Sequence, residues 1–194
     1  TRPSSPVSST ASSSPAAHRA FHSSGSLSPP AAASRSGVAR SPKIRAASPW
    51  AAARIAFAGL QAGVCSGSLA RAVAHTAVRE QFGRPLATRQ AVQLRAADAY
   101  MDTEAIRVTA YEAAWRHDRA LPAREHALTA AWWASEAGKR VVHAGQHLHG
   151  GTGADLDHPV HRHFLWGRQL DAYLGCGTEL LAELGDVLAK GEPS

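Results

Sequence analysis

The sequence predicts an all-α protein, an antiparallel four-helix bundle that follows a disordered N-terminal segment. From Pro49 onward, apolar residues recur every three or four positions instead of alternating, which is the spacing of one helix face. Ser, Pro, Ala and Arg dominate residues 1–48, where large apolar side chains are almost absent. The chain has 194 residues, enough for one domain with a core of its own.

Residues 1–48 cannot bury enough apolar surface to offset the entropy lost on ordering, so we predict that they are disordered. They are rich in Ser and Arg and contain no acidic residue, as in an organellar transit peptide. Out-of-frame translation of a GC-rich region would give a similar composition. The chain begins at Thr1 and its only methionine is Met101, as after a truncated or misassigned start. We favour a fragment or artefact over a targeting peptide.

The net charge of +6 does not predict a nucleic-acid-binding surface. Six of the 21 Lys and Arg lie in residues 1–48, which leaves fifteen basic and fifteen acidic residues in 49–194. The two cysteines form neither a disulfide framework nor a zinc-ligand spacing, so we expect a reducing, cytoplasmic location. No apolar run reaches the ~20 residues that a membrane span requires.

Four helices are expected in residues 49–194. The first carries Gly59, Gly63 and Gly67 at every fourth position. Each glycine costs about 1 kcal/mol of helix propensity, so this ladder predicts the close approach of another helix. Short links between long helices favour an antiparallel bundle. The expected helices span about 50–82, about 88–118, from after Pro122 to about His149, and about 159–190 with a break near Gly175 and Gly177.

Three stretches have compositions that core packing does not explain. "VREQFGRPLATRQAVQ" interrupts an alanine-rich helical pattern with an arginine, an amide, an aromatic ring and a glycine. "QHLHGGTGAD" ends a helix in a glycine pair, which suits a close backbone approach to a ligand, although a helix C-cap explains Gly150–Gly151 equally well. "YLGCGTELLAELG" places a hydroxyl after glycines at a helix start, where free N–H groups can bind phosphate.

Taken in order, "REQFGRPL", Gln90, "HLHGGTG" and "HPVHRHFLWGRQLDAYLGCGT" resemble the C-terminal helical domain of acyl-CoA dehydrogenases. The resemblance covers about residues 49–189. It implies a four-helix bundle that packs over FAD and builds a homo- or hetero-oligomeric interface with another acyl-CoA dehydrogenase subunit. The residues at the family's flavin-contact positions are Arg79, Gln81, Phe82, Gln90, His147, Gly150, Gly151 and Thr178.

The resemblance also assigns roles within this set. Arg79, Gln81 and Phe82 match positions at the pyrophosphate and adenine side of the flavin, where a guanidinium pairs well with phosphate oxygens. The Gly150–Gly151 pair matches the loop against the FAD of the neighbouring subunit. His147 stands where the family usually has Gln, and Thr178 matches the threonine that approaches the flavin.

"LHGGTGADLDHPVHRHFLWGRQLD" looks like subunits of actinobacterial heteromeric acyl-CoA dehydrogenases that act on steroid side-chain or similarly bulky CoA thioesters. Family enzymes form 2-enoyl-CoA by removing the α-proton with a Glu while a hydride passes to the flavin. Cys176 fills one family position for this Glu, and no acidic residue precedes Glu80 on the first bundle helix, which carries the other. We therefore predict no catalytic residue in this chain, and no dehydrogenation by it alone.

Two alternatives belong to other classes. A scaffold bundle could keep the fold and bind no flavin. A metal-binding helical protein could use His143 and His147, one helical turn apart, or the later cluster of His158, His161 and His163, but no Cys or carboxylate completes a familiar ligand spacing, so no metal is predicted.

Overall fold

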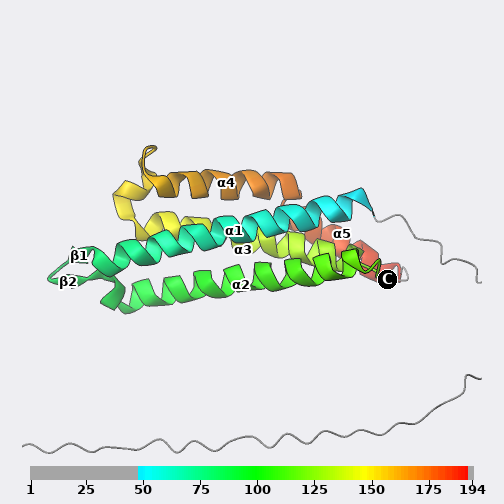
Figure 1. Cartoon of the computed structure of the whole chain (residues 1–194), viewed down its shortest axis with the longest axis horizontal. Coiled ribbons are helices and arrows are strands. Elements are labelled where there is room, and N and C mark those ends of the chain that lie inside the picture. Colours follow the sequence, from blue (N-terminus) through cyan, green and yellow to red (C-terminus); the bar gives the residue numbers. More distant parts are fainter. Residues whose placement is uncertain (1–47, 192–194) are drawn as a thin grey trace, which may run out of the picture. The chain divides into compact units, whose positions relative to one another are not determined.

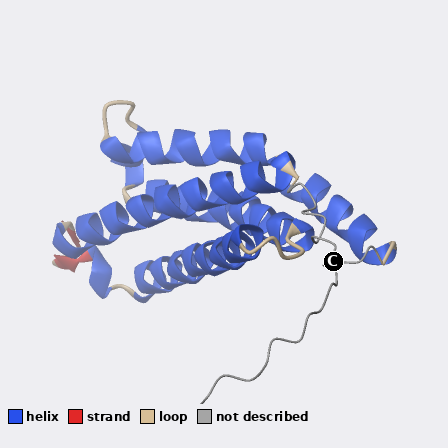
Figure 2. Ribbon diagram, turned by 45° about the vertical axis from the view of Figure 1, so that its right-hand side comes forward, coloured by secondary structure: helices blue, strands red, loops and turns tan. Residues whose placement is uncertain are grey.

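The computed structural model describes residues 48–191 and is almost entirely helical, which confirms the all-α prediction (Figures 1 and 2). Among these residues the α-helices are α1 (Pro49–Val78), α2 (Gln90–Asp118), α3 (Arg124–Leu148), α4 (Pro159–Leu174) and α5 (Gly177–Ala189). The remaining elements are the strands β1 (Glu80–Gln81) and β2 (Arg84–Pro85) and the 3-10 helices η1 (Leu86–Thr88) and η2 (Gly150–Ala154).

The first four helices alternate in direction, as expected for an antiparallel bundle (Figure 1). Helices α1 and α3 run toward the end that carries the β1–β2 hairpin, and α2 and α4 run away from it. Helix α3 packs against α1, α2, α4 and α5. Helices α2 and α4 lie on opposite sides of the α1–α3 pair (Figures 1 and 2).

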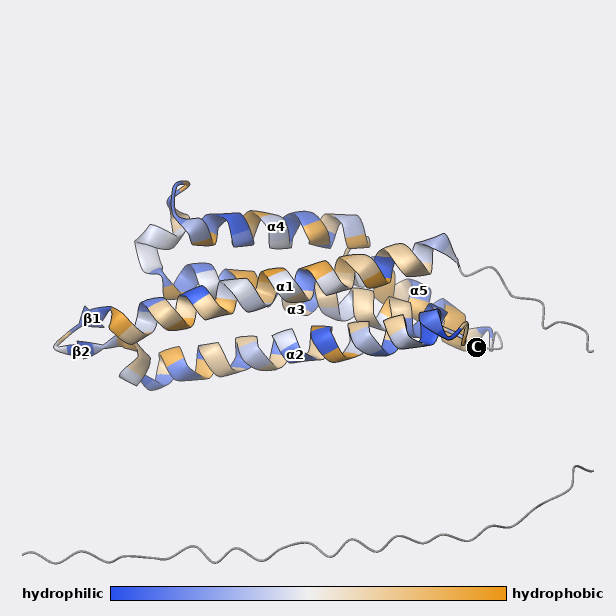
Figure 3. Cartoon of the chain, in the orientation of Figure 1, coloured by the Kyte–Doolittle hydropathy of each residue, from blue (hydrophilic) through white to orange (hydrophobic). Residues whose placement is uncertain are grey.

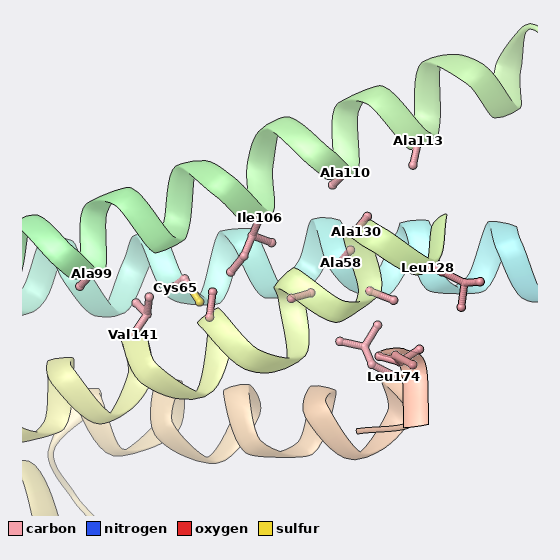
Figure 4. Close-up of a cluster of buried hydrophobic side chains, with 14 of the residues drawn as sticks. Ala58, Cys65, Ala99, Ile106, Ala110, Ala113, Leu128, Ala130, Val141 and Leu174 are labelled. Carbon is pink, nitrogen blue, oxygen red and sulfur yellow. The ribbon is translucent and has the colours of Figure 1, made fainter. Parts of the chain in front are cut away.

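The core between α1, α2 and α3 is built largely from alanine (Figure 4). Its large, fully buried apolar side chains include Ile106, Leu128 and Val141. Small side chains let helix backbones approach closely, but they bury little apolar surface per residue. Several large apolar side chains remain on the outer face of α2, which has apolar patches in Figure 3. These are Leu94, Tyr100, Met101, Val108, Tyr111 and Trp115.

The helix boundaries differ from the expected ones in two places. The first helix ends at Val78 instead of continuing to Phe82, because residues 80–85 form a hairpin with a positive φ of 54° at Phe82. The expected break in the last helix is confirmed: Gly175 has a φ of 101° and closes α4, and α5 begins at Gly177. The four-helix bundle therefore has its fourth helix in two pieces.

The glycine ladder of α1 is only partly explained by helix packing within this chain. At Gly67 an added Cβ would lie 2.7 Å from Nε2 of His163 on α4, so the tip of that half-buried imidazole would have to move. At Gly59 and Gly63 an added Cβ would meet no atom within 4 Å. The described chain therefore supplies no close helix at these two positions, and such an approach stays a prediction for a partner.

Two further expectations concern the N-terminal segment and membrane-spanning helices. The predicted disorder of residues 1–48 lies, apart from Ser48, outside the described residues. Within the described helices, none combines the length and the apolar character that crossing a membrane would need.

Candidate functional site

The hairpin after α1 presents the first group of candidate residues. Helix α1 ends when Arg79 turns to an extended conformation, with its N–H donating to the carbonyl of His75 at 2.9 Å. Gln81 then pairs with Arg84 across a two-residue turn. Both turn residues have positive φ, 54° at Phe82 and 75° at Gly83, which is the conformation of a type I′ turn. Glycine adopts it freely, whereas a bulky aromatic residue does so at a cost of about 1–3 kcal/mol.

Arg89 fixes this hairpin, a role that the sequence pattern did not indicate. Its Nη2 donates to the carbonyl oxygen of Gln81 at 2.8 Å, and its guanidinium carbon lies 5.1 Å from the centre of the Phe82 ring. The ring itself is 89% exposed. Phe82 is thus displayed in a fixed position instead of being buried in this chain.

Arg79 is exposed, and within residues 48–191 its guanidinium has no hydrogen-bond or ion-pair partner. Many other arginines of the bundle do have one, such as Arg140, which makes a two-pronged ion pair with Asp102 at 2.7 and 2.8 Å. An exposed, unpaired guanidinium on a fixed backbone is able to bind an anion.

The end of α3 supplies the second group. His147 is exposed on the last turn, and Gly150 follows the C-cap with a φ of 64°, so helix termination accounts for this glycine. Gly151 is different, since its φ is not in the left-handed region and an added Cβ would meet no atom within 4 Å. None of the residues that the structure describes requires a glycine at position 151.

Seven of the eight candidates lie at the same end of the bundle. The hairpin with Arg79, Gln81 and Phe82, the start of α2 at Gln90 and the end of α3 are all located there (Figure 1). A ring contact ties the two groups together, because the imidazoles of His75 on α1 and His149 after α3 stack with centroids 4.6 Å apart.

The structure does not bring Thr178 to this group. Thr178 is the second residue of α5, which follows the far end of α4. A helix of 16 residues is about 24 Å long, so α4 separates Thr178 from the glycine pair. Thr178 is exposed, like the other seven candidates.

A carboxylate that the sequence analysis did not identify lies beside the start of α5. Glu136 on α3 places its side chain where a Cβ at Gly177 would be, and it also accepts a hydrogen bond from Lys139 at 2.8 Å. Cys176, which the resemblance puts at one position of the catalytic Glu, is exposed with a φ of 57°. Glu179 is exposed on α5. Only the packing of α3 against α5 reveals Glu136, since 40 residues separate it from Cys176 along the chain.

Buried polar groups anchor the turn that carries Cys176. The N–H of Cys176 donates to the backbone oxygen of Asp171 at 3.3 Å. The carboxylate of Asp171 is buried and accepts a hydrogen bond from the hydroxyl of Ser135 on α3. The α4–α5 turn is therefore tied to α3.

The histidines do not form a metal site in the described part of the chain, where no three His, Cys, Asp or Glu side chains are grouped to hold an ion. His143 and His147 are both exposed, and the ring of His143 packs edge-on against Phe164 at 4.9 Å. His158 contacts the ring of His149 at 4.9 Å.

Residues 45–185 match the sequence family described as "Acyl-CoA dehydrogenase, C-terminal domain". Among curated proteins, the chain is 43% identical over 138 residues to the acyl-CoA dehydrogenase FadE27 of Mycobacterium tuberculosis, covering 67% of this chain and 37% of FadE27.

Two solved structures are similar in both fold and sequence. A variant of the Tcur3481-Tcur3483 steroid ACAD has a TM-score of 0.72 and 47% identity, over 74% of this chain and 40% of that one. The ChsE4-ChsE5 complex from Mycobacterium tuberculosis has a TM-score of 0.71 and 41% identity, over 75% of this chain and 39% of that one.

The chain thus spans about two fifths of the length of these relatives. The matched region contains the whole bundle from α1 to α4 and most of α5. The chain therefore belongs to the acyl-CoA dehydrogenase family, of which it carries the C-terminal helical domain.

Proposed function

We propose that this chain is the C-terminal domain, as a fragment or a partner subunit, of an FAD-dependent acyl-CoA dehydrogenase that oxidises acyl-CoA to 2-enoyl-CoA. In this assembly it contributes flavin contacts and subunit interface, and another chain or domain supplies the catalytic carboxylate. The observation that carries the proposal is the hairpin end of the bundle, where exposed candidate residues are held in fixed positions and the Arg79 guanidinium has no partner among the described residues.

The residues at this end fit a dinucleotide that carries a pyrophosphate. Arg79 has an exposed, unpaired guanidinium that can donate two parallel hydrogen bonds to phosphate oxygens. Phe82 offers an exposed ring of the kind that stacks on a flat base. Gly151 leaves backbone accessible where this chain itself has no need for a glycine.

FAD, when bound, would supply the hydride acceptor for oxidation of the acyl group. The described residues do the binding and positioning: Arg79 holds the phosphates, and Arg89 holds the hairpin so that Phe82 keeps its place. At the far end of α4, the start of α5 presents Thr178 from a turn that Asp171 ties to α3.

The distance between the two ends supports an oligomeric site. Because α4 is about 24 Å long, the Gly150–Gly151 end and Thr178 serve different parts of one extended flavin or two different flavins. The FadE27-like sequence and the two solved assemblies named above support a heteromeric partner of the same family, with a steroid-type acyl-CoA as the substrate.

The test is reconstitution with a partner acyl-CoA dehydrogenase subunit, followed by measurement of bound flavin from its visible absorbance. Arg79→Ala should lower flavin affinity about tenfold or more, since a charge-assisted hydrogen bond is worth about 1.5–3 kcal/mol. Arg119→Ala is the matched control, because Arg119 lies at the opposite end of the bundle, over the ring of Trp115. It should leave flavin content unchanged.

Dye reduction with a bulky acyl-CoA tests the origin of the base. Cys176→Ala should leave turnover of the complex nearly unchanged, because a thiol is a poor substitute for a carboxylate base. Loss of turnover in this variant, or flavin content that is indifferent to Arg79→Ala, would contradict the proposal. A complex that forms and stays colourless would instead favour a scaffold bundle without flavin.

A further inference from the structure

Three imidazole rings from three helices meet beside the Gly150–Gly151 loop. His75 comes from the last turn of α1, His149 is the C-cap of α3, and His158 is the N-cap of α4. The His75 and His149 rings are stacked at 4.6 Å, and the His149 and His158 rings meet edge to face at 4.9 Å. His149, in the middle, is 6% exposed.

Hydrogen bonds determine which ring nitrogens carry a proton. Nδ1 of His149 lies 2.7 Å from the carbonyl oxygen of Gly145, and since a carbonyl only accepts, this nitrogen is the donor. Nδ1 of His158 accepts the backbone N–H of Val160 at 3.2 Å and so carries no proton. Protonation of His158 at this nitrogen would remove the N-cap of α4.

The loop is seated directly on His149. The hydroxyl of Thr152 donates to the backbone oxygen of His149 at 2.8 Å. Gly153 is buried, and an added Cβ there would lie 3.1 Å from Cβ of His149 and closer still to the carbonyl of Gln146. The position of His149 therefore sets the position of the loop.

The surroundings of the stack oppose a positive charge. Burial lowers the pKa of His75 below its ordinary 6.5. The nearby His149, His158 and Arg79 lower it further, in that order of importance. Burial is also the main cause that lowers the pKa of His149. The hydrogen bond to Gly145 opposes this, and the nearby His158 and Arg71 lower the pKa further.

The linker between η2 and α4 carries two carboxylates, Asp155 and Asp157. Between η2 and α4, the carboxylate of Asp155 accepts the backbone N–H of Asp157 at 3.0 Å, within the linker itself. Within residues 48–191, no carboxylate is among the causes that shift the pKa of His75 or His149.

We propose that His149, held between His75 and His158, is a positioning residue for the Gly150–Ala154 loop, and that it holds the loop only while the three rings are uncharged. A second proton would place like charges on rings less than 5 Å apart, in a setting that already holds Arg71 and Arg79. The stack is thus an acid-sensitive latch on the loop. Its consequence for flavin binding rests on the proposed function, but the latch does not.

The sign of the pH effect follows from the lowered pKa values. The closed loop binds fewer protons than an open loop in which the histidines regain their ordinary pKa, so acidification favours opening. The closed state is fully favoured above pH 6.5 and is lost as the pH falls below it. At one pH unit below that value, each such histidine should increase the open population up to about tenfold.

Hydrogen exchange of the full chain tests this between pH 7.5 and 5.5, with rates corrected for the intrinsic effect of pH. Amides of residues 150–158 should lose protection on acidification, whereas the middle of α2 should not. His149→Phe and His75→Phe keep a flat ring but cannot be protonated, so each should weaken the pH dependence. His143→Gln changes an exposed histidine on the same helix as the control and should retain it.

A loop whose corrected exchange does not change with pH, or changes equally in His149→Phe and wild type, would overturn the latch. If a variant fails to fold, titration of the wild-type imidazole resonances decides instead. His75 and His149 should titrate below 6.5 together with chemical-shift changes at Gly150–Ala154, and titration at or above 6.5 would also overturn it. The flavin content of the reconstituted complex is measured separately at both pH values. If the loop opens on acidification and the flavin content stays constant, the latch stands and only its link to the proposed function is contradicted.

Discussion

Gly167→Ala should destabilise the bundle, even though alanine is the better helix former. Gly167 faces α3 from the middle of α4, and an added Cβ would lie 2.5 Å from Cγ1, 3.0 Å from Cγ2 and 3.2 Å from Cβ of Val142. Val142 is fully buried and branched at Cβ, so rotation only exchanges one clashing methyl for another. Carbon atoms pack at about 3.5–4.0 Å, and the two helices must therefore separate by about 1 Å.

The magnitude combines three effects. Overpacking of this kind costs about 1–3 kcal/mol. Separation of the helices also strains the hydrogen bond that the Gln61 amide donates to the carbonyl of Gly167. This hydrogen bond is 3.2 Å long and contributes about 0.5–1.5 kcal/mol. Replacement of glycine in a helix returns about 1 kcal/mol. The free energy of unfolding should fall by about 0.5–3.5 kcal/mol.

Urea unfolding of the isolated chain, followed by far-UV circular dichroism, measures this change. Gly63→Ala is the matched control, since its Cβ meets nothing within 4 Å and the substitution should stabilise the isolated chain by about 1 kcal/mol. Val142→Ala should partly relieve Gly167→Ala, so the double variant should be more stable than the sum of the single effects predicts. Additive effects, or a Gly167→Ala chain as stable as wild type, would refute the clash.

Two further predictions concern the thiols and the tether of α5. Burial, and to a smaller extent the charge of Asp102, raises the pKa of the Cys65 thiol to about 12, whereas Cys176 is exposed. Mass spectrometry after brief alkylation at pH 8 should therefore find one label per folded chain, at Cys176. Labelling of Cys65 at a similar rate would contradict its buried position. Arg54 makes two hydrogen bonds to Glu183 on α5, at 2.6 and 3.0 Å, and this contact lowers the pKa of Glu183 below 4.5. The pair stabilises the folded chain above pH 4.5, and this stabilisation is lost as the pH falls. Because both side chains are partly exposed, Arg54→Ala should lower the free energy of unfolding by at most about 1 kcal/mol at pH 7 and by little at pH 3. Thermal unfolding at both pH values measures this difference.

The sequence predicted the helices well because apolar periodicity and Gly or Pro boundaries are local signals. The end of α1 was placed four residues too late, since a positive φ at Phe82 is unusual for an aromatic residue and only Gly83 marks the turn. Arg89 was not identified because its role depends on where the hairpin folds back.

The candidate residues were predicted from a family resemblance. Their arrangement in space could not have been deduced from their spacing along the sequence. Seven candidates share one end because α1 and α3 both run toward it, which only the bundle topology establishes. Glu136 meets the start of α5 through the packing of two helices that are distant in sequence. Contacts of this kind leave no periodic signal.

The glycines fall into two groups, according to whether an added Cβ would clash within this chain. Glycine is required at Gly167, because a Cβ would press on the buried Val142, and at Gly67 a Cβ would displace the imidazole tip of His163. Gly59, Gly63 and Gly151 have open space around them, and the two within α1 each cost about 1 kcal/mol of helix propensity with no return inside the described chain. If another subunit or domain packs against α1, Gly63→Ala should stabilise the isolated chain while weakening assembly with the partner. Those two opposite effects of one methyl group would locate the interface on α1, whereas an equal gain in both states would place it elsewhere.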